Sequence, residues 1–250
     1  MENTESYKSY IKSPRRSIKH TTYFHSYDHF FHKYRNKDIT FVEIGILDGG
    51  SLFMWRDYFG PDARIIGVDL NPNAKKWESE GFEIFIGSQS DENFWSQFVN
   101  LVGTIDVVLD DGGHTYKQQI TTTECLIEYI NDGGIILIED THTSYMKGFG
   151  KRRNSFINYA KDRIDAINYR FSALDGSRSE NRIWSIEIVE SMVGFKVNKK
   201  ATELPSNPTS NSGEAERAED YRYESFDNAL IFRWLKRKIR SFLRNISNRT

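Results

Sequence analysis

The chain of 250 residues has one cysteine, five prolines and no long apolar run, and these absences narrow what it can be. A single cysteine, Cys125, excludes an internal disulfide and fits a reducing compartment. No apolar stretch approaches the roughly 20 residues that span a bilayer. The N-terminus also lacks the apolar core of a signal peptide. We therefore expect a cytoplasmic protein.

The net charge of −1 is unevenly distributed along the chain. Residues 229–250 carry seven basic side chains and no acid, and subtracting them from the total leaves −8 on residues 1–228. An acidic body is a poor partner for nucleic acid. Only the basic tail could bind it, and such binding should weaken steeply with salt.

Acidic side chains follow two short apolar runs, VVL and GIILI, which end in the pairs Asp110-Asp111 and Glu139-Asp140. The intervening segment fits one helix and a turn, which predicts a βαβ unit. Functional groups collect at the carboxyl ends of parallel strands, so the four acids and His114 should meet at one edge. Because gathered carboxylates repel each other, we expect a hard divalent cation such as Mg²⁺ there.

The upstream sequence reads as strand, glycine loop, helix and strand. ITFVEIG is followed by ILDGGS, the helical segment LFMWRDYF and a second strand, RIIGVDL. This order opens a doubly wound nucleotide-type fold. The glycines Gly45, Gly49 and Gly50 do not form the GxGxxG fingerprint of dinucleotide enzymes. An NAD-dependent dehydrogenase is therefore unlikely, and it would leave the carboxylates unexplained.

Three polar positions lie where further strands end. Asp69 ends the second strand and is placed to accept hydrogen bonds from ribose hydroxyls, although a turn cap before Asn71-Pro72 would also explain it. Ser88 and Gln89 follow the third strand, FEIFIGS, where short polar groups could reach an adenine edge.

Alternating apolar residues in IWSIEIVESMVGFKVNK predict two antiparallel strands near the end of the folded region. Together with the five upstream strands, they complete the predicted fold class. We expect an α/β, Rossmann-like fold with a mostly parallel seven-stranded sheet that ends in an antiparallel hairpin, and helices on both faces.

Composition divides the chain into four parts. Residues 1–38 hold aromatic residues at helical spacing and four histidines that do not share one helix face. This pattern favours a helix that covers the fold rather than a metal site. Residues 39–199 hold the predicted α/β domain. Residues 200–228 are polar and predict a disordered linker. Residues 229–250 form a basic amphipathic pattern, typical of a peripheral membrane anchor at the inner face of the membrane or of a helix docked on its own domain or a partner copy.

At this point several motifs carry a specific resemblance. EIGILDGGSLFMWRDYF, GVDLNPN, GSQSD, LDDGGH and IEDTHTSY resemble a class I S-adenosylmethionine (SAM) methyltransferase. They are most similar to metal-dependent sugar O-methyltransferases of the mycinamicin and demethylmacrocin type, over roughly residues 18–198. The resemblance identifies residues 39–199 as a SAM-dependent methyltransferase domain and implies methyl transfer from SAM to a sugar hydroxyl of a glycoside, glycolipid or polysaccharide.

The resemblance also assigns roles to individual positions. Those that would hold SAM are Glu43 and Gly45 at the methionine end, Ser51 in the loop against it, Asp69 at the ribose, and Ser88 and Gln89 near the adenine. Asp111, Glu139 and Asp140 would bind the metal, which would hold two neighbouring hydroxyls and lower the pKa of one. Asp110 is set aside as a residue that faces the cofactor or caps the loop.

The general base stays open among several groups. His114 is one candidate, because an imidazole side chain suits proton transfer near neutral pH, although a packing role would equally explain it. Related sugar methyltransferases commonly carry a histidine in the penultimate strand, where this chain has Glu187. Glu187 or a hydroxide on the metal are therefore alternatives, and His142 is expected to be structural.

Other readings of the function remain. One is a small-molecule, catechol-like O-methyltransferase, and another is a non-catalytic module tethered to a membrane. The basic side chains of residues 147–153 could meet a phosphate or acidic saccharide, or form a solvated loop. The chain could also form a homo-oligomer.

Overall fold

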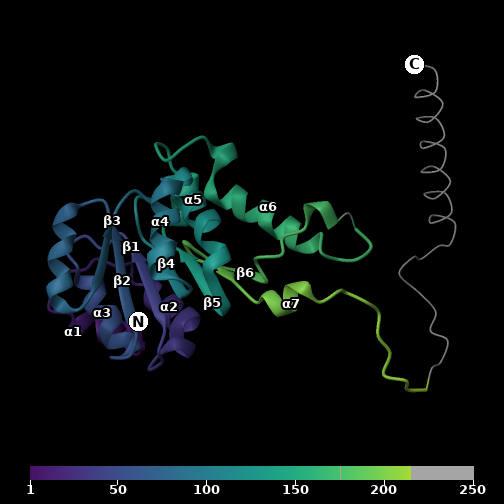
Figure 1. The fold of residues 1–250 in the computed structure, drawn as a ribbon, viewed down its shortest axis with the longest axis horizontal. Coiled ribbons are helices and arrows are strands. Elements are labelled where there is room, and N and C mark those ends of the chain that lie inside the picture. Colours follow the sequence, from purple (N-terminus) through teal and green to yellow (C-terminus); the bar gives the residue numbers. More distant parts are fainter. Residues whose placement is uncertain (175, 215–250) are drawn as a thin grey trace, which may run out of the picture. The chain divides into compact units, whose positions relative to one another are not determined.

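A computed structural model describes residues 1–174 and 176–214 of the chain (Figure 1). It divides into two compact units, Met1–Asn207 and Pro208–Thr250. The described part of the second unit, residues 208–214, contains no helix or strand. The predicted basic helix and residues 215–228 of the predicted linker lie outside the described residues. A short helix, α7 (Lys199–Glu203), occupies the start of that linker.

The first unit contains a seven-stranded sheet in the order β3-β2-β1-β4-β5-β7-β6. The strands are β1 (Thr40–Ile44), β2 (Arg64–Asp69), β3 (Glu83–Ile86), β4 (Ile105–Asp110), β5 (Ile130–Ile138), β6 (Ser185–Val189) and β7 (Met192–Lys196). Strands β1 to β5 pair in parallel, whereas β7 is antiparallel to both β5 and β6. The predicted fold class, including the final hairpin, is confirmed.

Helices cover both faces of the sheet (Figure 1). The α-helices of the first unit other than α7 are α1 (Glu5–Lys12), α2 (Tyr23–Phe31), α3 (Gly50–Phe59), α4 (Glu92–Val102), α5 (Tyr116–Leu126) and α6 (Phe156–Asn168). The 3₁₀ helices are η1 (His32–Tyr34), η2 (Pro72–Glu80), η3 (Ile127–Tyr129), η4 (Thr141–Tyr145), η5 (Arg152–Asn154) and η6 (Gly176–Arg178).

Alternate residues of each central strand enter different cores. In β4, Val107 and Leu109 pack with residues of α2 and α3, whereas Val108 packs on the opposite face with residues of α4 to α6. This alternation follows from the two-residue period of a strand. It explains why the strands are apolar throughout, since both faces are buried.

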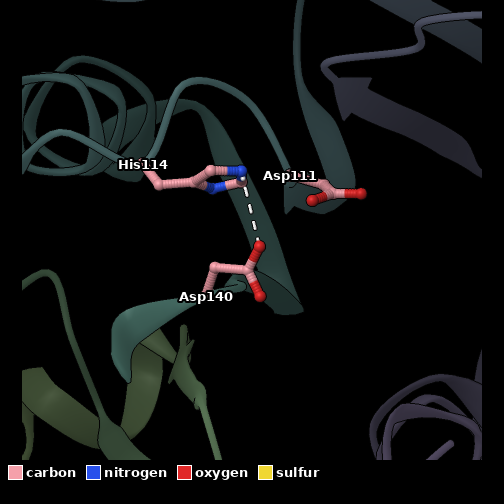
Figure 2. A group of neighbouring side chains, drawn as sticks. All are labelled: Asp111, His114 and Asp140. Atoms are coloured by element: carbon pink, nitrogen blue, oxygen red, sulfur yellow. Dashed lines mark ion pairs between the residues drawn. The ribbon is translucent and has the colours of Figure 1, made fainter. Parts of the chain in front are cut away.

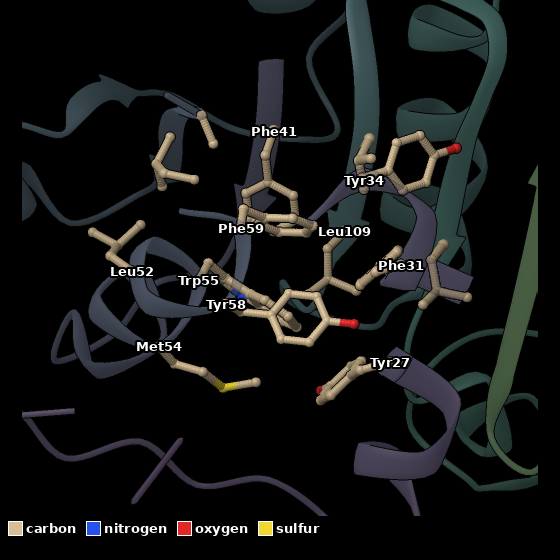
Figure 3. Close-up of a cluster of buried hydrophobic side chains, with 14 of the residues drawn as sticks. Tyr27, Phe31, Tyr34, Phe41, Leu52, Met54, Trp55, Tyr58, Phe59 and Leu109 are labelled. Carbon is tan, nitrogen blue, oxygen red and sulfur yellow. The ribbon is translucent and has the colours of Figure 1, made fainter. Parts of the chain in front are cut away.

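The aromatic side chains of α2 pack into the core on one face of the sheet (Figure 3). The rings of Tyr27 and Phe31 contact that of Trp55 with centroids 5.0 and 5.6 Å apart, and Phe41 of β1 lies 5.2 Å from Trp55. Aromatic pairs at these distances each contribute about 0.5–1.5 kcal/mol beyond their burial. The N-terminal segment is thereby fixed beside the carboxyl ends of the strands.

Among the residues described, no helix has both the length and the apolar character needed to cross a bilayer.

Candidate active site

A cavity of about 380 Å³ opens at the carboxyl ends of the central strands. Its lining includes Gly45 after β1, Asp69 at the end of β2, Gly87 after β3, and Asp111 after β4. Strand β1 lies between β2 and β4, so the order of the strands reverses here. Such a switch point is where open α/β sheets bind ligands.

Gly45 lets the backbone after β1 pass close to the loop that follows β4. Its φ is +84°, and a Cβ there would lie 2.2 Å from the carbonyl oxygen of Asp111. The backbone N–H of Asp111 donates to the carbonyl of Ile44 at 3.0 Å. A side chain at position 45 would therefore separate two loops that the cavity needs together.

Asp69 lies at the cavity, and its carboxylate also organises two turns. It accepts hydrogen bonds from the backbone N–H groups of Ile46 and Leu47 at 3.0 and 3.2 Å, and from that of Asn71 at 2.8 Å. The turn-capping contact considered from the sequence is therefore present. A carboxylate offers about four acceptor positions, so one remains for a ligand.

Gln89 lines the cavity, whereas Ser88 is not among the lining residues. The Gln89 amide donates to both carboxylate oxygens of Asp110, at 2.9 and 3.0 Å, and accepts from the backbone N–H of Gly113 at 2.8 Å. Ser88 lies 3.0 Å from the Ser90 hydroxyl. Gln89 thus holds the loop after β4, and its amide compensates the buried Asp110.

Ser51 lies in the first turn of α3, beside a second cavity of about 140 Å³. That helix has no side-chain cap, because its N-cap residue is Gly49. The N–H of Leu52 donates to the carbonyl of Gly49 at 3.1 Å, but no side chain of the N-cap residue caps the first turn, and a helix N-terminus of this kind favours an anionic group such as a carboxylate.

Asp111, His114 and Asp140 come together beyond β4 and β5 (Figure 2). One ligand atom from each lies within 4.8 Å of the other two. The Nε2 atom of His114 is 3.4 Å from Oδ2 of Asp140. This oxygen and nitrogen donor set suits a hard or borderline divalent cation.

Two of these three residues have unusual backbone angles. His114 has φ +57° and Asp140 has φ +53°, both in the left-handed region. Such conformations cost on the order of 1–3 kcal/mol in non-glycine residues and cluster at functional sites. A capping box formed by Thr115 and Gln118 starts α5 directly after His114 and fixes its position.

Glu139 lies behind this group and is not part of it. Its side chain is buried, and Oε1 accepts a hydrogen bond from the Tyr27 hydroxyl at 2.6 Å. Its Oε2 atom is buried, lies 3.6 Å from Lys19 Nζ and has no hydrogen-bond partner in the described part of the chain. Burial, reinforced by the charge of Asp111, raises the pKa of the Glu139 carboxyl well above its ordinary value.

Glu43 at the end of β1 is also completely buried. Its Oε1 accepts from the Trp55 indole at 3.1 Å, and its Oε2 has no hydrogen-bond partner among the residues that the structure describes. Burial raises the pKa of this carboxyl, although the nearby Lys19 opposes the change. Two buried carboxylates with unpartnered oxygens indicate that the site is arranged for further positive charge.

Asp140 is held by groups from other segments. The Tyr23 hydroxyl of α2 donates to Oδ1, and His142 Nδ1 lies 3.8 Å from the same oxygen. His142 itself lies 2.9 Å from the Ser191 hydroxyl. These contacts suit an orienting role for His142, in line with the structural role expected for it.

Glu187 is not brought to this group. It lies on the edge strand β6, where it pairs in register with Gly194, and two strand spacings separate β6 from β5. With about 4.8 Å per spacing, the strand is about 10 Å from β5. Its carboxylate contacts His29 and Lys196 instead, and its pKa is lowered although burial opposes the change, because those two side chains donate to it.

Lys19, Tyr23 and Tyr27 also reach the site, although no sequence motif predicted it. Lys19 Nζ lies 2.6 Å from Oδ2 of Asp111, and the two tyrosines donate to the acids that follow β5. The aromatic spacing indicated a helix but gave no sign that its hydroxyls reach the site. Lys19 stands outside any periodic pattern, so no signal in the sequence singled it out.

Comparison with known proteins agrees with the arrangement. Residues 42–141 match a family model described as a methyltransferase domain. The chain is 31% identical over 166 residues to mycinamicin VI 2''-O-methyltransferase of Micromonospora griseorubida, which covers 61% of this chain and 41% of that protein. It is 30% identical to demethylmacrocin O-methyltransferase of Streptomyces fradiae, with 61% and 42% covered.

A third relative is a tetracenomycin 3'-O-methyltransferase from Streptomyces olivaceus that acts on a methoxyrhamnosyl compound. It is 36% identical over 156 residues, which cover 57% of this chain and 40% of the relative. The chain therefore matches less than half the length of these curated relatives.

Among solved structures, the fold is similar to that of MycE, a methyltransferase from the mycinamycin biosynthetic pathway. The complex of MycE with Mg and SAH has a TM-score of 0.68 and 26% identity, covering 82% of this chain and 56% of that one. The complex that also contains mycinamycin VI gives a TM-score of 0.69, with 82% and 55% covered.

Proposed function

We propose that the chain carries a class I SAM-dependent methyltransferase domain and transfers the methyl group of SAM to a hydroxyl of a sugar-containing acceptor with a divalent cation such as Mg²⁺. The observation that carries the proposal is the grouping of Asp111, His114 and Asp140 beside the cavity at the carboxyl edge of the sheet.

The proposed SAM-binding site is the cavity of about 380 Å³. The free acceptor position of Asp69 suits a ribose hydroxyl, and the uncapped start of α3 at Ser51 suits the methionine carboxylate. Glu43, with an unpartnered oxygen, suits the methionine ammonium. When bound, SAM supplies a methyl group on a positively charged sulfur. The close approach of Gly45 to Asp111 would bring the bound SAM close to the metal and the acceptor hydroxyl.

The proposed metal ligands are Asp111 and Asp140, with Glu139 offering the buried oxygen that has no hydrogen-bond partner. Asp111 and Asp140 fit a divalent cation, because a carboxylate oxygen of each lies within 4.8 Å of the other and of a His114 nitrogen. When bound, the metal supplies positive charge that orients the acceptor and makes its hydroxyl more acidic. The tyrosines of α2 hold two of these carboxylates in place.

We assign the general base to His114. Its imidazole lies at the edge of the site, with Nε2 near Asp140 and a buried Nδ1 that has no hydrogen-bond partner. A neutral imidazole can take the proton of the acceptor hydroxyl, and Asp140 would stabilise the imidazolium that results. Glu187 receives no role in this proposal, because its described contacts are with His29 and Lys196.

The proposed acceptor class is supported by the names of the relatives, which describe O-methylation of mycinamicin VI, of demethylmacrocin and of a rhamnosyl tetracenomycin. The chain spans only about 40% of their length, so the acceptor of this protein is part of the proposal. Polysaccharides and glycolipids extend the same sugar chemistry.

We also propose that the basic segment 229–250 binds an anionic membrane surface. The support is its composition of seven basic residues, apolar residues at helical spacing and no acid. Cosedimentation with vesicles that contain anionic lipid should be lost when residues 229–250 are deleted. Binding that survives the deletion would contradict this role.

The experiment for the activity is incubation with methyl-labelled SAM, Mg²⁺ and a panel of glycosides and polysaccharide extracts. We expect label on a sugar oxygen, identified by mass spectrometry and NMR. Label found on nitrogen or on an aglycone hydroxyl would reject the sugar O-methyltransferase proposal.

A further inference from the structure

Lys19 is an almost fully buried lysine in the middle of the acidic site. Its side chain is 2% exposed. The Nζ atom lies 2.6 Å from Oδ2 of Asp111, 3.6 Å from Oε2 of Glu139 and 3.7 Å from Oε1 of Glu43. Within the described residues, no other lysine or arginine lies within 4.0 Å of these three carboxylates.

The lysine comes from the segment between α1 and α2, residues 13–22, which we call the N-terminal strap. The strap is tied down at two points. The Ser13 hydroxyl donates to the carbonyl of Gly50 at 2.8 Å, and the Tyr10 hydroxyl donates to the carbonyl of Ser17 at 3.0 Å. These bonds hold the strap over the start of α3 and aim Lys19 into the site.

Lys19 faces three carboxylates from different segments of the chain. Within the described residues its hydrogen bond goes to Asp111, and Glu139 and Glu43 lie at ion-pair distance. At 2.6 Å the contact between Lys19 and Asp111 is an ion pair whose lysine side chain is 2% exposed. A positive charge of the protein therefore already occupies one of the proposed metal-binding carboxylates.

Asp111 is shared between Lys19 and the proposed metal group. We propose that Lys19 is a built-in counter-ion of the metal-binding carboxylates, with which the divalent cation competes for Asp111. The inference rests on the metal-dependent function proposed above. An ammonium a few ångströms from a divalent cation repels it strongly in a partly buried site. Lys19 therefore lowers the affinity of the site for the metal. When no metal is bound, Lys19 holds the carboxylates close to one another.

The cavity of about 140 Å³ beside Lys19 gives the ammonium room to move aside. It is lined by Ser17 and Lys19 of the strap and by Gly45, Ser51 and Asp111 of the site. A shift of Nζ into this space would release Oδ2 of Asp111 without unfolding the strap. The same space adjoins the proposed methionine end of SAM, so the charge of Lys19 acts on both ligands.

The test is a titration with Mn²⁺, followed by the EPR signal of the free ion, without SAM and at one pH. Lys19→Met removes the charge and keeps much of the side-chain volume, and Lys19→Arg keeps the charge. Lys12→Met is the matched control, because Lys12 pairs with Asp57 at 3.0 Å on the surface of α1. We expect Lys19→Met to bind Mn²⁺ at least about tenfold more tightly than wild type, since it removes a nearby repulsive charge. Lys19→Arg and Lys12→Met should stay within a few-fold.

Unchanged or weaker binding by Lys19→Met, with wild type binding Mn²⁺, would overturn the counter-ion role and leave the proposed function intact. Absence of Mn²⁺ binding in wild type and Lys19→Met alike would overturn both. If Lys19→Met folds poorly, the thermal unfolding of the variant is measured in EDTA and again after Mn²⁺ is added in excess. Recovery of the folded form on addition of Mn²⁺ supports the proposal, and lack of recovery contradicts it.

Discussion

The carbonyl oxygen of Asp111 lies so close to Gly45 that a Cβ there would approach it to 2.2 Å. One residue therefore joins the loop after β1, proposed to hold SAM, to the loop after β4, proposed to hold the metal. The cavity and the acidic group are parts of one site because these two loops touch.

Gly45→Ala should abolish SAM binding and destabilise the fold. The substitution imposes both an unfavourable positive φ and a clash with the Asp111 backbone. Gly103→Ala is a matched control, because Gly103 has φ +82° and no atom within 4 Å of its Cβ position. The control should lose about 1–3 kcal/mol of stability from backbone strain alone and keep SAM affinity. Equal SAM affinity in the two variants, measured by calorimetry, would contradict the proposed SAM-binding site.

Asp111→Asn should weaken metal binding by at least about tenfold, since it removes one negative ligand from a partly buried site. Asp62→Asn serves as the control, because Asp62 is exposed on the loop before β2. Mn²⁺ titrations of both variants measure the effect. Similar affinities for the two would show that the metal binds elsewhere.

His114→Gln should lower turnover by about 10²–10⁴-fold, the usual contribution of a general base. Metal affinity should change by only a few-fold, because Asp111 and Asp140 remain. His142→Gln is the comparison, since His142 also lies near Asp140 but contacts Ser191. Turnover on an identified acceptor and Mn²⁺ titration separate the two roles. Loss of metal affinity in His114→Gln would make His114 a ligand instead.

Glu139→Gln should stabilise the metal-free protein increasingly as the pH rises. Burial raises the pKa of Glu139 well above the 4.5 of a free glutamate, so above pH 4.5 the unfolded chain releases a proton that the folded protein retains. The contribution of Glu139 to stability is therefore present at low pH and lost as pH rises. A glutamine does not titrate and avoids this loss. Urea unfolding in EDTA at several pH values measures the difference.

Glu83→Gln should give the opposite slope. Its hydrogen bond with Arg64 lowers the pKa of Glu83, so its contribution is present above pH 4.5 and is lost as the pH falls. Glu83→Gln should thus be less stable than wild type at neutral pH and equal to it in acid. Parallel pH profiles for the two variants would be inconsistent with a Glu139 pKa raised in the folded protein.

The fold could be predicted largely because both faces of its strands are buried. Runs such as GIILI are apolar throughout, and acids follow them at the carboxyl edge, so the pattern indicates both the sheet and the place of the site. Local chemistry of this kind is readable from neighbouring residues. It placed Asp111, His114 and Asp140 at one edge without knowledge of the three-dimensional packing.

Contacts made across long sequence separations could not be predicted in the same way. Lys19 lies 92 residues from Asp111, and Tyr27 lies 112 residues from Glu139. Nothing in the spacing of these residues records the pairing, because packing of α2 against the sheet creates it. Glu187 illustrates the converse: its position in the penultimate strand suggested a base, whereas the edge position of β6 gives it other partners.

The central claim, a metal-dependent methyl transfer at the Asp111 group, is tested most directly by a rescue measurement. Methyl transfer from labelled SAM to an accepted glycoside is measured with wild-type enzyme in EDTA and again after Mg²⁺ is added back. The Asp111→Asn variant is measured in parallel. The account predicts that wild-type transfer is lost in EDTA and returns with Mg²⁺, whereas the variant needs far more Mg²⁺ or stays inactive. Transfer that continues unchanged in EDTA would contradict it.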